Sequence, residues 1–255
     1  MKIVRFVEND AARVGVLRDG MVFRAHGTPF ATLDIGEAVG PLEDLRLLPP
    51  VEPTKIIGVG LNYARHVTEH DPNRQIPSEP VLFMKPTTAL IPHGGTILLP
   101  PGDRIELEAE LCVVIGRQAY RVSEDAAPDY ILGYTCGNDV SHRDFQRKDG
   151  QWVRAKGFDT FAPIGPAIEP ETDPADLEIT SRLNGQVRQQ SRTAHMLFRP
   201  AFLVSFISNV MTLLPGDIIM TGTPEGVAAL APGDTIEVEI EGIGILRNDV
   251  AARDA

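Results

Sequence analysis

The sequence has few of the features that mark secreted, membrane or zinc-finger proteins. Its 255 residues include only two cysteines, Cys112 and Cys136, and their spacing fits neither a disulfide framework nor a structural zinc site. The most apolar stretch, residues 201–214, is too short to cross a bilayer and contains polar side chains. The first ten residues carry charges throughout and lack the apolar segment of a signal peptide. We therefore expect a water-soluble, cytoplasmic protein.

Positive charge is also scarce. The chain has 24 Lys and Arg against 35 Asp and Glu, a formal net charge of −11, and no run of basic residues. Such a chain has no electrostatic footprint for nucleic acid or an anionic membrane. The glycine patterns of phosphate-binding loops and dinucleotide-binding turns are absent as well. We expect a small-molecule substrate, with no nucleic acid or membrane as a partner.

Turn signals divide the chain into a small first module and a larger domain. Asp19-Gly20 separates two β-type runs, which is a strong signal for a hairpin. Pro49, Pro50 and Pro53 then interrupt the chain before another apolar run begins. We predict a β-rich N-terminal module over residues 1–52 and a catalytic domain over residues 53–255.

The larger domain is predicted to be mostly β. Asn184-Gly185 indicates a second hairpin, and helical spacing of apolar residues is clear only over residues 200–211. With 43% hydrophobic residues, the chain can bury a large core. The fold class is mixed α+β, predominantly β, with short helices around mixed sheets.

Three carboxylates suggest a metal site. Glu108 and Glu110 stand two residues apart in a strand-like run, so their side chains should project from one face. Asp139 follows another apolar run and should lie at a strand end. Three oxygen ligands suit Mg²⁺ or Mn²⁺, and Ca²⁺ can occupy similar sites. The alternative is that Glu106, Glu108 and Glu110 line the solvated face of an edge strand.

Other polar residues are candidates for the chemistry around such a metal. Lys156 stands among aromatic residues and could bind a carboxylate or oppose developing negative charge, although an ordinary surface lysine is the simpler interpretation. His66 and Glu69 have the spacing of neighbours on a helical turn, where the carboxylate would orient a general base. The proline-rich residues 71–80 could form a flap that carries this pair, or simply an exposed loop. Thr223 lies in a small-residue loop that could bind a carboxylate.

Together, these segments resemble the fumarylacetoacetate hydrolase family in its short prokaryotic and mitochondrial form. The resemblance extends from about residue 55 to residue 250 and is carried by Gly60-Leu61-Asn62-Tyr63-Ala64-Arg65-His66, Phe83-Met84-Lys85-Pro86, Glu108-Ala109-Glu110-Leu111, Gly137-Asn138-Asp139-Val140-Ser141-His142-Arg143-Asp144, Ala155-Lys156-Gly157-Phe158-Asp159 and Leu214-Pro215-Gly216-Asp217-Ile218-Ile219-Met220-Thr221-Gly222-Thr223-Pro224. Each segment is weak alone, but their joint occurrence in this order is specific.

The resemblance implies a mixed β-roll catalytic domain, a homodimer, and Mg²⁺ or Mn²⁺ held by the residues that match Glu108, Glu110 and Asp139. It also implies that Arg143, Gln146 and Lys156 contact the oxo-acid end of the substrate and that His66 and Glu69 lie on a lid. The chain lacks the large N-terminal extension of the enzymes that cleave fumarylacetoacetate, which argues against that substrate.

The expected function is therefore metal-dependent chemistry on 2-oxo or 2-hydroxy-dienoic acids. The preferred reaction is hydrolysis of the C–C bond of an acylpyruvate through a metal-stabilised enolate. The alternatives are isomerisation or decarboxylation of a 2-hydroxyhepta-2,4-diene-1,7-dioate in aromatic catabolism, and decarboxylation of oxaloacetate. A non-catalytic metal-binding scaffold is a further alternative. A glycosidase is disfavoured because Glu108 and Glu110 share one strand.

Overall fold

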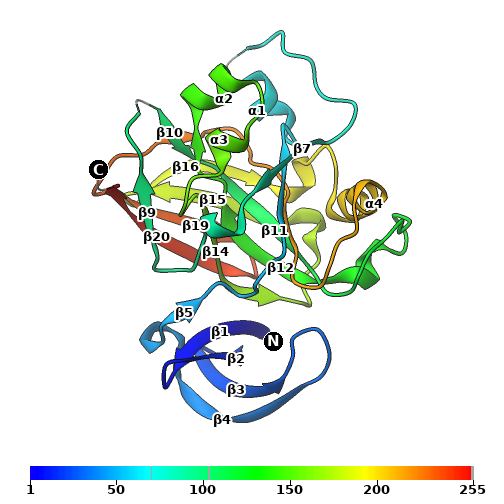
Figure 1. The fold of residues 1–255 in the computed structure, drawn as a ribbon, viewed down its shortest axis with the longest axis vertical. Helices are drawn as coiled ribbons and strands as arrows, with labels where there is room; N and C mark the ends of the chain where they lie inside the picture. The colour runs from blue at the N-terminus through cyan, green and yellow to red at the C-terminus, as the bar shows by residue number, and fades with distance from the viewer. Residues whose placement is uncertain (70, 103, 254–255) are drawn as a thin grey trace.

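The computed structural model describes residues 1–69, 71–102 and 104–253 (Figure 1). Strands dominate and helices are few, so the fold class predicted from the sequence is confirmed. The helices are α1 (Ala64–Thr68), α2 (Arg143–Asp149), α3 (Val153–Lys156) and α4 (Pro200–Val210). Short 3-10 helices lie at Leu42–Asp44, Thr87–Ala89, Ala127–Tyr130, Pro174–Asp176 and Thr193–His195.

The N-terminal strands form a meander, which is the lower body in Figure 1. They are β1 (Lys2–Glu8), β2 (Ala11–Arg18), β3 (Met21–Gly27), β4 (Leu33–Pro41) and β5 (Leu47–Leu48). The hairpin predicted at Asp19-Gly20 joins β2 to β3, and both turn residues have positive φ (47° and 79°), as a type I′ turn requires.

The meander continues into the main body. Within the described residues, the long sheet has the order β4-β3-β2-β1-β14-β12-β11-β17-β6-β7, with β1 next to β14. Its later strands are β6 (Ile56–Gly60), β7 (Val81–Lys85), β8 (Leu90–Ile91, paired with β14), β11 (Ala109–Ile115), β12 (Ile131–Asn138), β14 (Ala162–Glu169) and β17 (Ile218–Met220).

A second sheet packs against β11 and β12 and closes the main core. Its order is β16-β15-β19-β20-β9. The strands are β9 (Thr96–Leu99), β15 (Glu178–Leu183), β16 (Gln186–Arg192), β19 (Thr235–Ile240) and β20 (Gly244–Ala252). Apolar side chains of both sheets and of α4 share one buried cluster. The hairpin predicted at Asn184-Gly185 joins β15 to β16.

The third sheet is small and borders the site. It pairs β13 (Ser141–His142), β10 (Ile105–Leu107) and β18 (Ala228–Ala229). Because β10 ends at Leu107 and β11 begins at Ala109, Glu108 lies at the junction of two sheets rather than inside one continuous strand.

Strand β11 explains why its sequence is apolar without alternation. It lies between β12 and β17, and all seven of its residues are buried. Leu111 and Val113 pack into the main cluster, whereas Cys112 and Val114 pack into a second cluster on the other face. A strand covered on both faces needs apolar side chains at every position, so a charge here must be compensated by its neighbours.

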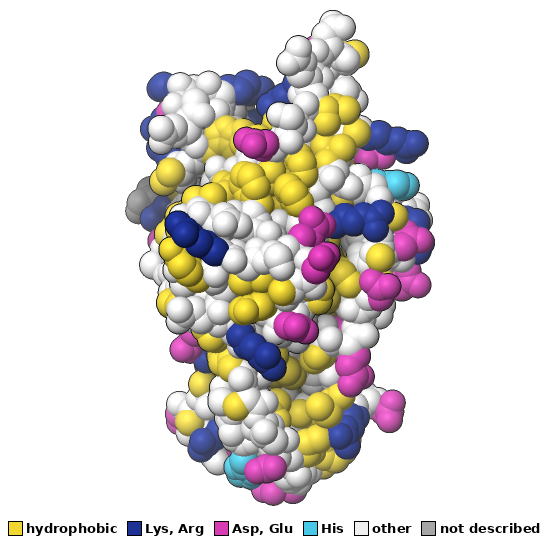
Figure 2. Space-filling view, turned by 90° about the vertical axis from the view of Figure 1, so that its right-hand side faces the viewer, with side chains coloured by type: hydrophobic (Ala, Val, Ile, Leu, Met, Phe, Trp, Pro, Cys, Tyr) yellow, Lys and Arg dark blue, Asp and Glu magenta, His cyan; other side chains and the backbone are white. Residues whose placement is uncertain are grey.

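Figure 2 shows the face that carries α4, with apolar side chains gathered across its middle. The ring of Phe198, which precedes α4, stacks on Phe202, and Phe202 stacks on Phe206, with centroid distances of 5.6 and 6.0 Å. In the described part of the chain, no helix is both long and apolar enough to cross a membrane. The homodimer expected from the family resemblance stays a prediction.

Candidate active site

The three predicted metal ligands meet in one buried cluster. One carboxylate oxygen from each of Glu108, Glu110 and Asp139 lies within 4.8 Å of the other two. Their side chains reach it from the junction of β10 with β11, from β11 itself, and from the residue after β12. All three are at most 3% exposed. The alternative that this run of glutamates faces solvent on an edge strand is therefore wrong, because β11 is central and Glu106 is buried too.

The backbone around the cluster fixes the orientation of these carboxylates. The amide of Gly222 donates to Glu110 Oε2 at 2.8 Å. Gly222 has a φ of 99°, and a Cβ there would lie 2.7 Å from the Cβ of Asn62, so a larger residue could not place this amide. The amide of Asp139 donates to the carbonyl of Glu108 at 2.9 Å, which joins two of the ligand positions directly.

Lys156 lies against the carboxylates, so its interpretation as a surface lysine is wrong. It is 2% exposed, and its ammonium donates to Glu108 Oε2 at 2.6 Å and to Asp139 Oδ2. It also lies 4.8 Å from the centre of the Phe83 ring. Burial by itself would lower the pKa of Lys156, but the charges of Asp139 and Glu108 outweigh it, so the pKa is raised and the group is a cation.

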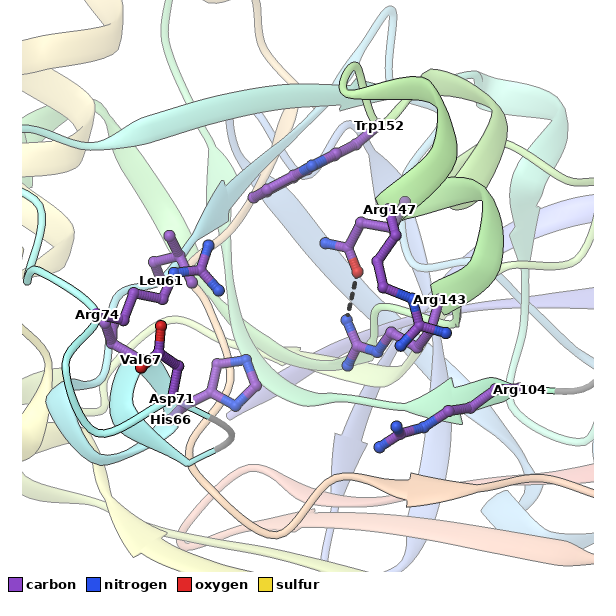
Figure 3. A pocket seen from close by; sticks show the side chains of 10 residues that line it. Leu61, His66, Val67, Asp71, Arg74, Arg104, Arg143, Arg147 and Trp152 are labelled. Atoms are coloured by element: carbon purple, nitrogen blue, oxygen red, sulfur yellow. Dashed lines mark hydrogen bonds between the residues drawn. The ribbon is translucent and has the colours of Figure 1, made fainter.

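Arg143 and Gln146 lie on the other side of Glu108, at the start of α2. The Arg143 guanidinium donates to Glu108 Oε1, to Glu106 Oε2 at 2.6 Å and to the Gln146 side-chain oxygen at 2.8 Å (Figure 3). Burial disfavours the ionised form of Glu108, but Arg143 and Lys156 hold the pKa of Glu108 well below its usual range. Two cations therefore keep this carboxylate charged.

Glu110 has the opposite environment. Burial and the charges of Asp139 and Glu108 raise the pKa of Glu110 well above that of an ordinary carboxyl group. The buried carboxylates and cations explain this difference. Glu106, Glu108 and Asp139 each pair with at least one of Arg143, Arg104, Lys156 and Lys85, whereas Glu110 forms no ion pair with a described residue.

Lys85 was not among the residues predicted for the site, although it belongs to one of the segments of the family resemblance. Its ammonium donates to the carbonyls of Val140, Lys156 and Phe161 at 3.2, 2.7 and 2.7 Å. Asp139 Oδ1 lies 2.6 Å from this ammonium, so Lys85 and Asp139 form a buried ion pair. Lys85 thus ties the backbone of Lys156 to the segment that carries Asp139.

His66 and Glu69 stand opposite the cluster, on and just after α1. Nδ1 of His66 lies 3.1 Å from Glu69 Oε2, and Nε2 lies 3.9 Å from Glu108 Oε1. The other Glu69 oxygen accepts from the Gly226 amide at 2.9 Å. The pair is carried by α1, and residues 71–80 form irregular chain after it. Because Glu69 accepts at Nδ1, the proton of a neutral imidazole is placed there and Nε2 can act as a base.

Thr223 lies at the wall of the same cavity, between the carboxylates and β16. Its hydroxyl donates to the Ala109 carbonyl at 2.8 Å and accepts from the Gln189 side chain at 2.8 Å. The hydroxyl is thus engaged within the protein, and a role of Thr223 in substrate binding stays a prediction. Gln189 was not expected from the sequence, and a glutamine in a strand offers no signal that could have found it.

The residues fit a divalent metal. They offer hard oxygen ligands from three separate buried carboxylates whose oxygens lie close together. Mg²⁺ and Mn²⁺ prefer such ligands, and the described residues place no cysteine or second histidine there that would favour zinc.

Comparison with known proteins identifies the family. The fumarylacetoacetate (FAA) hydrolase C-terminal model matches residues 55–251, and the Rv2993c-like N-terminal model matches residues 1–50. The chain belongs to the fumarylacetoacetate hydrolase family. Family membership agrees with the resemblance stated from the sequence.

Three members of the fumarylacetoacetate hydrolase family illustrate its range. The chain is 38% identical to oxaloacetate tautomerase FAHD2A, mitochondrial, of Bos taurus, over 97% of this chain and 79% of the relative. It is 46% identical to the structure of a 5-carboxymethyl-2-hydroxymuconate delta-isomerase from Mycobacterium smegmatis, with a TM-score of 0.92 and coverage of 99% and 100%. A maleylpyruvate hydrolase from Sphingobium sp. SYK-6, in complex with manganese(II) and pyruvate, is 29% identical, with a TM-score of 0.81 and full coverage of both chains.

The raised pKa of Glu110 gives a prediction for metal binding. A divalent ion needs this carboxylate ionised, so binding should release a proton, and the apparent Mg²⁺ affinity should rise by up to about tenfold per pH unit below the Glu110 pKa. In the chelated protein, the raised pKa favours folding at low pH, and this contribution is lost as pH rises through the folded-state pKa. Thermal unfolding between about pH 5.5 and 8 should therefore show a Mg²⁺-induced increase in Tm that grows with pH. An increase that is constant or shrinks over this range would contradict the prediction.

Proposed function

We propose that the protein is a divalent-metal-dependent enzyme that moves a proton at C3 of a 2-oxo acid, so that its reaction is a tautomerisation or isomerisation of the enol. One observation carries this proposal: Nε2 of His66 faces the buried carboxylates at 3.9 Å from Glu108, while Glu69 holds Nδ1. A base fixed in this way is suited to proton transfer near a bound ligand.

Each residue of the site has a place in this proposal. A divalent metal bound by Glu108, Glu110 and Asp139 would polarise the 2-oxo group as a Lewis acid. Arg143 and Lys156 would bind the substrate carboxylate and balance negative charge on the 2-oxygen. Gln146 fixes the guanidinium of Arg143. His66 would take the proton from C3 at Nε2 and deliver it to the 2-oxygen in a tautomerisation, or to a conjugated carbon in an isomerisation, while Glu69 stabilises the protonated ring.

The order of the candidate reactions differs from the one expected from the sequence. The tautomerase and the delta-isomerase are 38% and 46% identical to this chain, whereas the maleylpyruvate hydrolase is 29% identical. Hydrolysis of an acylpyruvate is the second candidate, because the pyruvate in the maleylpyruvate hydrolase complex fits such a reaction. In that case His66 would take its proton from water instead of from carbon.

A direct experiment is to offer the purified protein three compounds with Mg²⁺: enol oxaloacetate, 2-hydroxyhepta-2,4-diene-1,7-dioate and acetylpyruvate. Ultraviolet absorbance follows loss of the enol, and chromatography identifies the products. We expect fast ketonisation or isomerisation, with no release of pyruvate from acetylpyruvate. Rapid pyruvate release with slow enol conversion would reverse the order, and no turnover of any compound would favour a metal-binding scaffold.

A further inference from the structure

The cavity over the carboxylate cluster adjoins a larger outer pocket of about 390 Å³. The two share Leu61, His66, Arg143, Gln146 and Trp152 in their walls, so they lie side by side. The outer pocket is lined in addition by three arginines that do not line the inner cavity. We call Arg74, Arg104 and Arg147 the arginine mouth.

The arginine mouth is assembled from three parts of the chain. Arg74 lies in the irregular segment after α1, Arg104 lies just before β10, and Arg147 lies on α2. Figure 3 shows Arg74 on the side of His66, and Arg104 and Arg147 on the opposite side with Arg143. Their side chains therefore approach the outer pocket from two sides.

The three arginines of the mouth differ in whether they have acidic partners. Arg147 donates to Asp144 at 2.7 Å in a surface pair, and Arg104 donates to Glu106, which Arg143 also contacts. Asp71 is the acidic residue in the lining, and its carboxylate accepts from the Asn73 amide at 3.0 Å. In residues 1–69, 71–102 and 104–253, the Arg74 side chain forms no ion pair. A chain with a net charge of −11 thus gathers three arginines at the entrance of one cavity.

We propose that the arginine mouth binds a second carboxylate at the far end of the substrate, so that the enzyme prefers dicarboxylic 2-oxo acids to monocarboxylic ones. This inference rests on the proposed function, which places the 2-oxo-acid end at the inner cluster. A guanidinium binds a carboxylate through two parallel hydrogen bonds, and arginines on two sides of a pocket can hold it from both. The side chains of Arg104 (41% exposed) and Arg147 (64% exposed) line this pocket and are open to solvent, although each also pairs with an acidic neighbour.

The test compares two ligands that differ only at the far end. The six-carbon acid 2-oxoadipate ends in a carboxylate, and 2-oxohexanoate ends in a methyl group. Calorimetric titration in the presence of Mg²⁺ measures binding without depending on turnover. We expect 2-oxoadipate to bind at least about tenfold more tightly, which corresponds to about 1.4 kcal/mol.

Variants then test whether the arginine mouth causes the tighter binding of 2-oxoadipate. Arg74→Gln combined with Arg147→Gln should reduce 2-oxoadipate affinity about tenfold, because each partly exposed ion pair contributes little alone. Affinity for 2-oxohexanoate should change less than about twofold. The matched control is Arg154→Gln on α3, where the guanidinium pairs with Asp149 and stacks on Phe145, and does not line the mouth.

Oxalate separates failure of this inference from failure of the proposed function, because it probes the inner cluster alone. If oxalate binds with Mg²⁺ but the two six-carbon acids bind equally, or the double variant weakens both equally, the arginine mouth does not recognise a carboxylate. If oxalate fails to bind with Mg²⁺, the proposed function is itself wrong, and the inference that rests on it falls too.

Discussion

Glu110→Gln should abolish Mg²⁺-dependent turnover while leaving the chelated protein as stable as the wild type near neutral pH. The substitution removes one of the three carboxylates proposed as metal ligands but keeps the shape of the side chain. In the chelated wild type, burial and neighbouring carboxylates already raise the Glu110 pKa and favour the neutral form. A neutral amide should therefore fit, and can still accept from the Gly222 amide. We expect a loss of at least about 10³-fold in kcat/KM, equivalent to about 4 kcal/mol.

Two measurements check this expectation. Thermal unfolding with chelator should give equal or higher Tm for Glu110→Gln, and the Tm increase caused by Mg²⁺ should disappear. Glu124→Gln, which changes an exposed glutamate away from the cavity, is the control for loss of one charge. A Glu110→Gln protein that keeps its response to Mg²⁺ would show that this carboxylate is no ligand.

His66→Gln should remove proton transfer and leave metal binding intact. Nε2 of the imidazole faces the carboxylate cluster, and Nδ1 lies against the carboxylate of Glu69. General base catalysis contributes about 10²- to 10⁴-fold to rates, so a loss in this range is expected. The most direct measurement is the exchange of the C3 protons of 2-oxobutyrate for deuterium in D₂O with Mg²⁺. Nuclear magnetic resonance monitors this exchange.

The exchange experiment separates a base from a structural residue. For His66→Gln, the Tm increase caused by Mg²⁺ and the affinity for oxalate should equal those of the wild type. His26→Gln, an exposed histidine on β3, is the matched control. If exchange by His66→Gln stays within about threefold of the wild type, another group takes the proton, and the role proposed for the His66–Glu69 pair is wrong.

Part of the site can be predicted from the sequence, because the residues concerned lie close to each other along the chain. Glu108 and Glu110 stand two residues apart beside an apolar run, and His66 and Glu69 stand three apart, so each pair is recognisable without knowing the fold. The meeting of Asp139 with the two glutamates was correctly anticipated from its place after an apolar run. The break between β10 and β11 at Glu108 could not be predicted from the sequence, because it results from the pairing of β10 with β13 and β18.

The rest depends on contacts between distant parts of the chain. Lys85 receives its carbonyl partners from residues 55, 71 and 76 positions away, so nothing in its own segment indicates that it is fully buried. The arginine mouth is likewise assembled from three separate segments. Long-range packing of this kind leaves no periodicity in the sequence, which is why these residues were found only in the structure.

The charges around the carboxylate cluster predict the order in which metal and substrate bind. Four buried acids, Glu106, Glu108, Glu110 and Asp139, lie beside four cations, Lys85, Lys156, Arg143 and the more exposed Arg104. With all four acids ionised these charges balance, so the inner cluster offers an anion no net attraction. A divalent ion would add two positive charges beside the carboxylates, which favours binding of a substrate carboxylate. Metal should therefore bind before substrate, and each should strengthen the binding of the other.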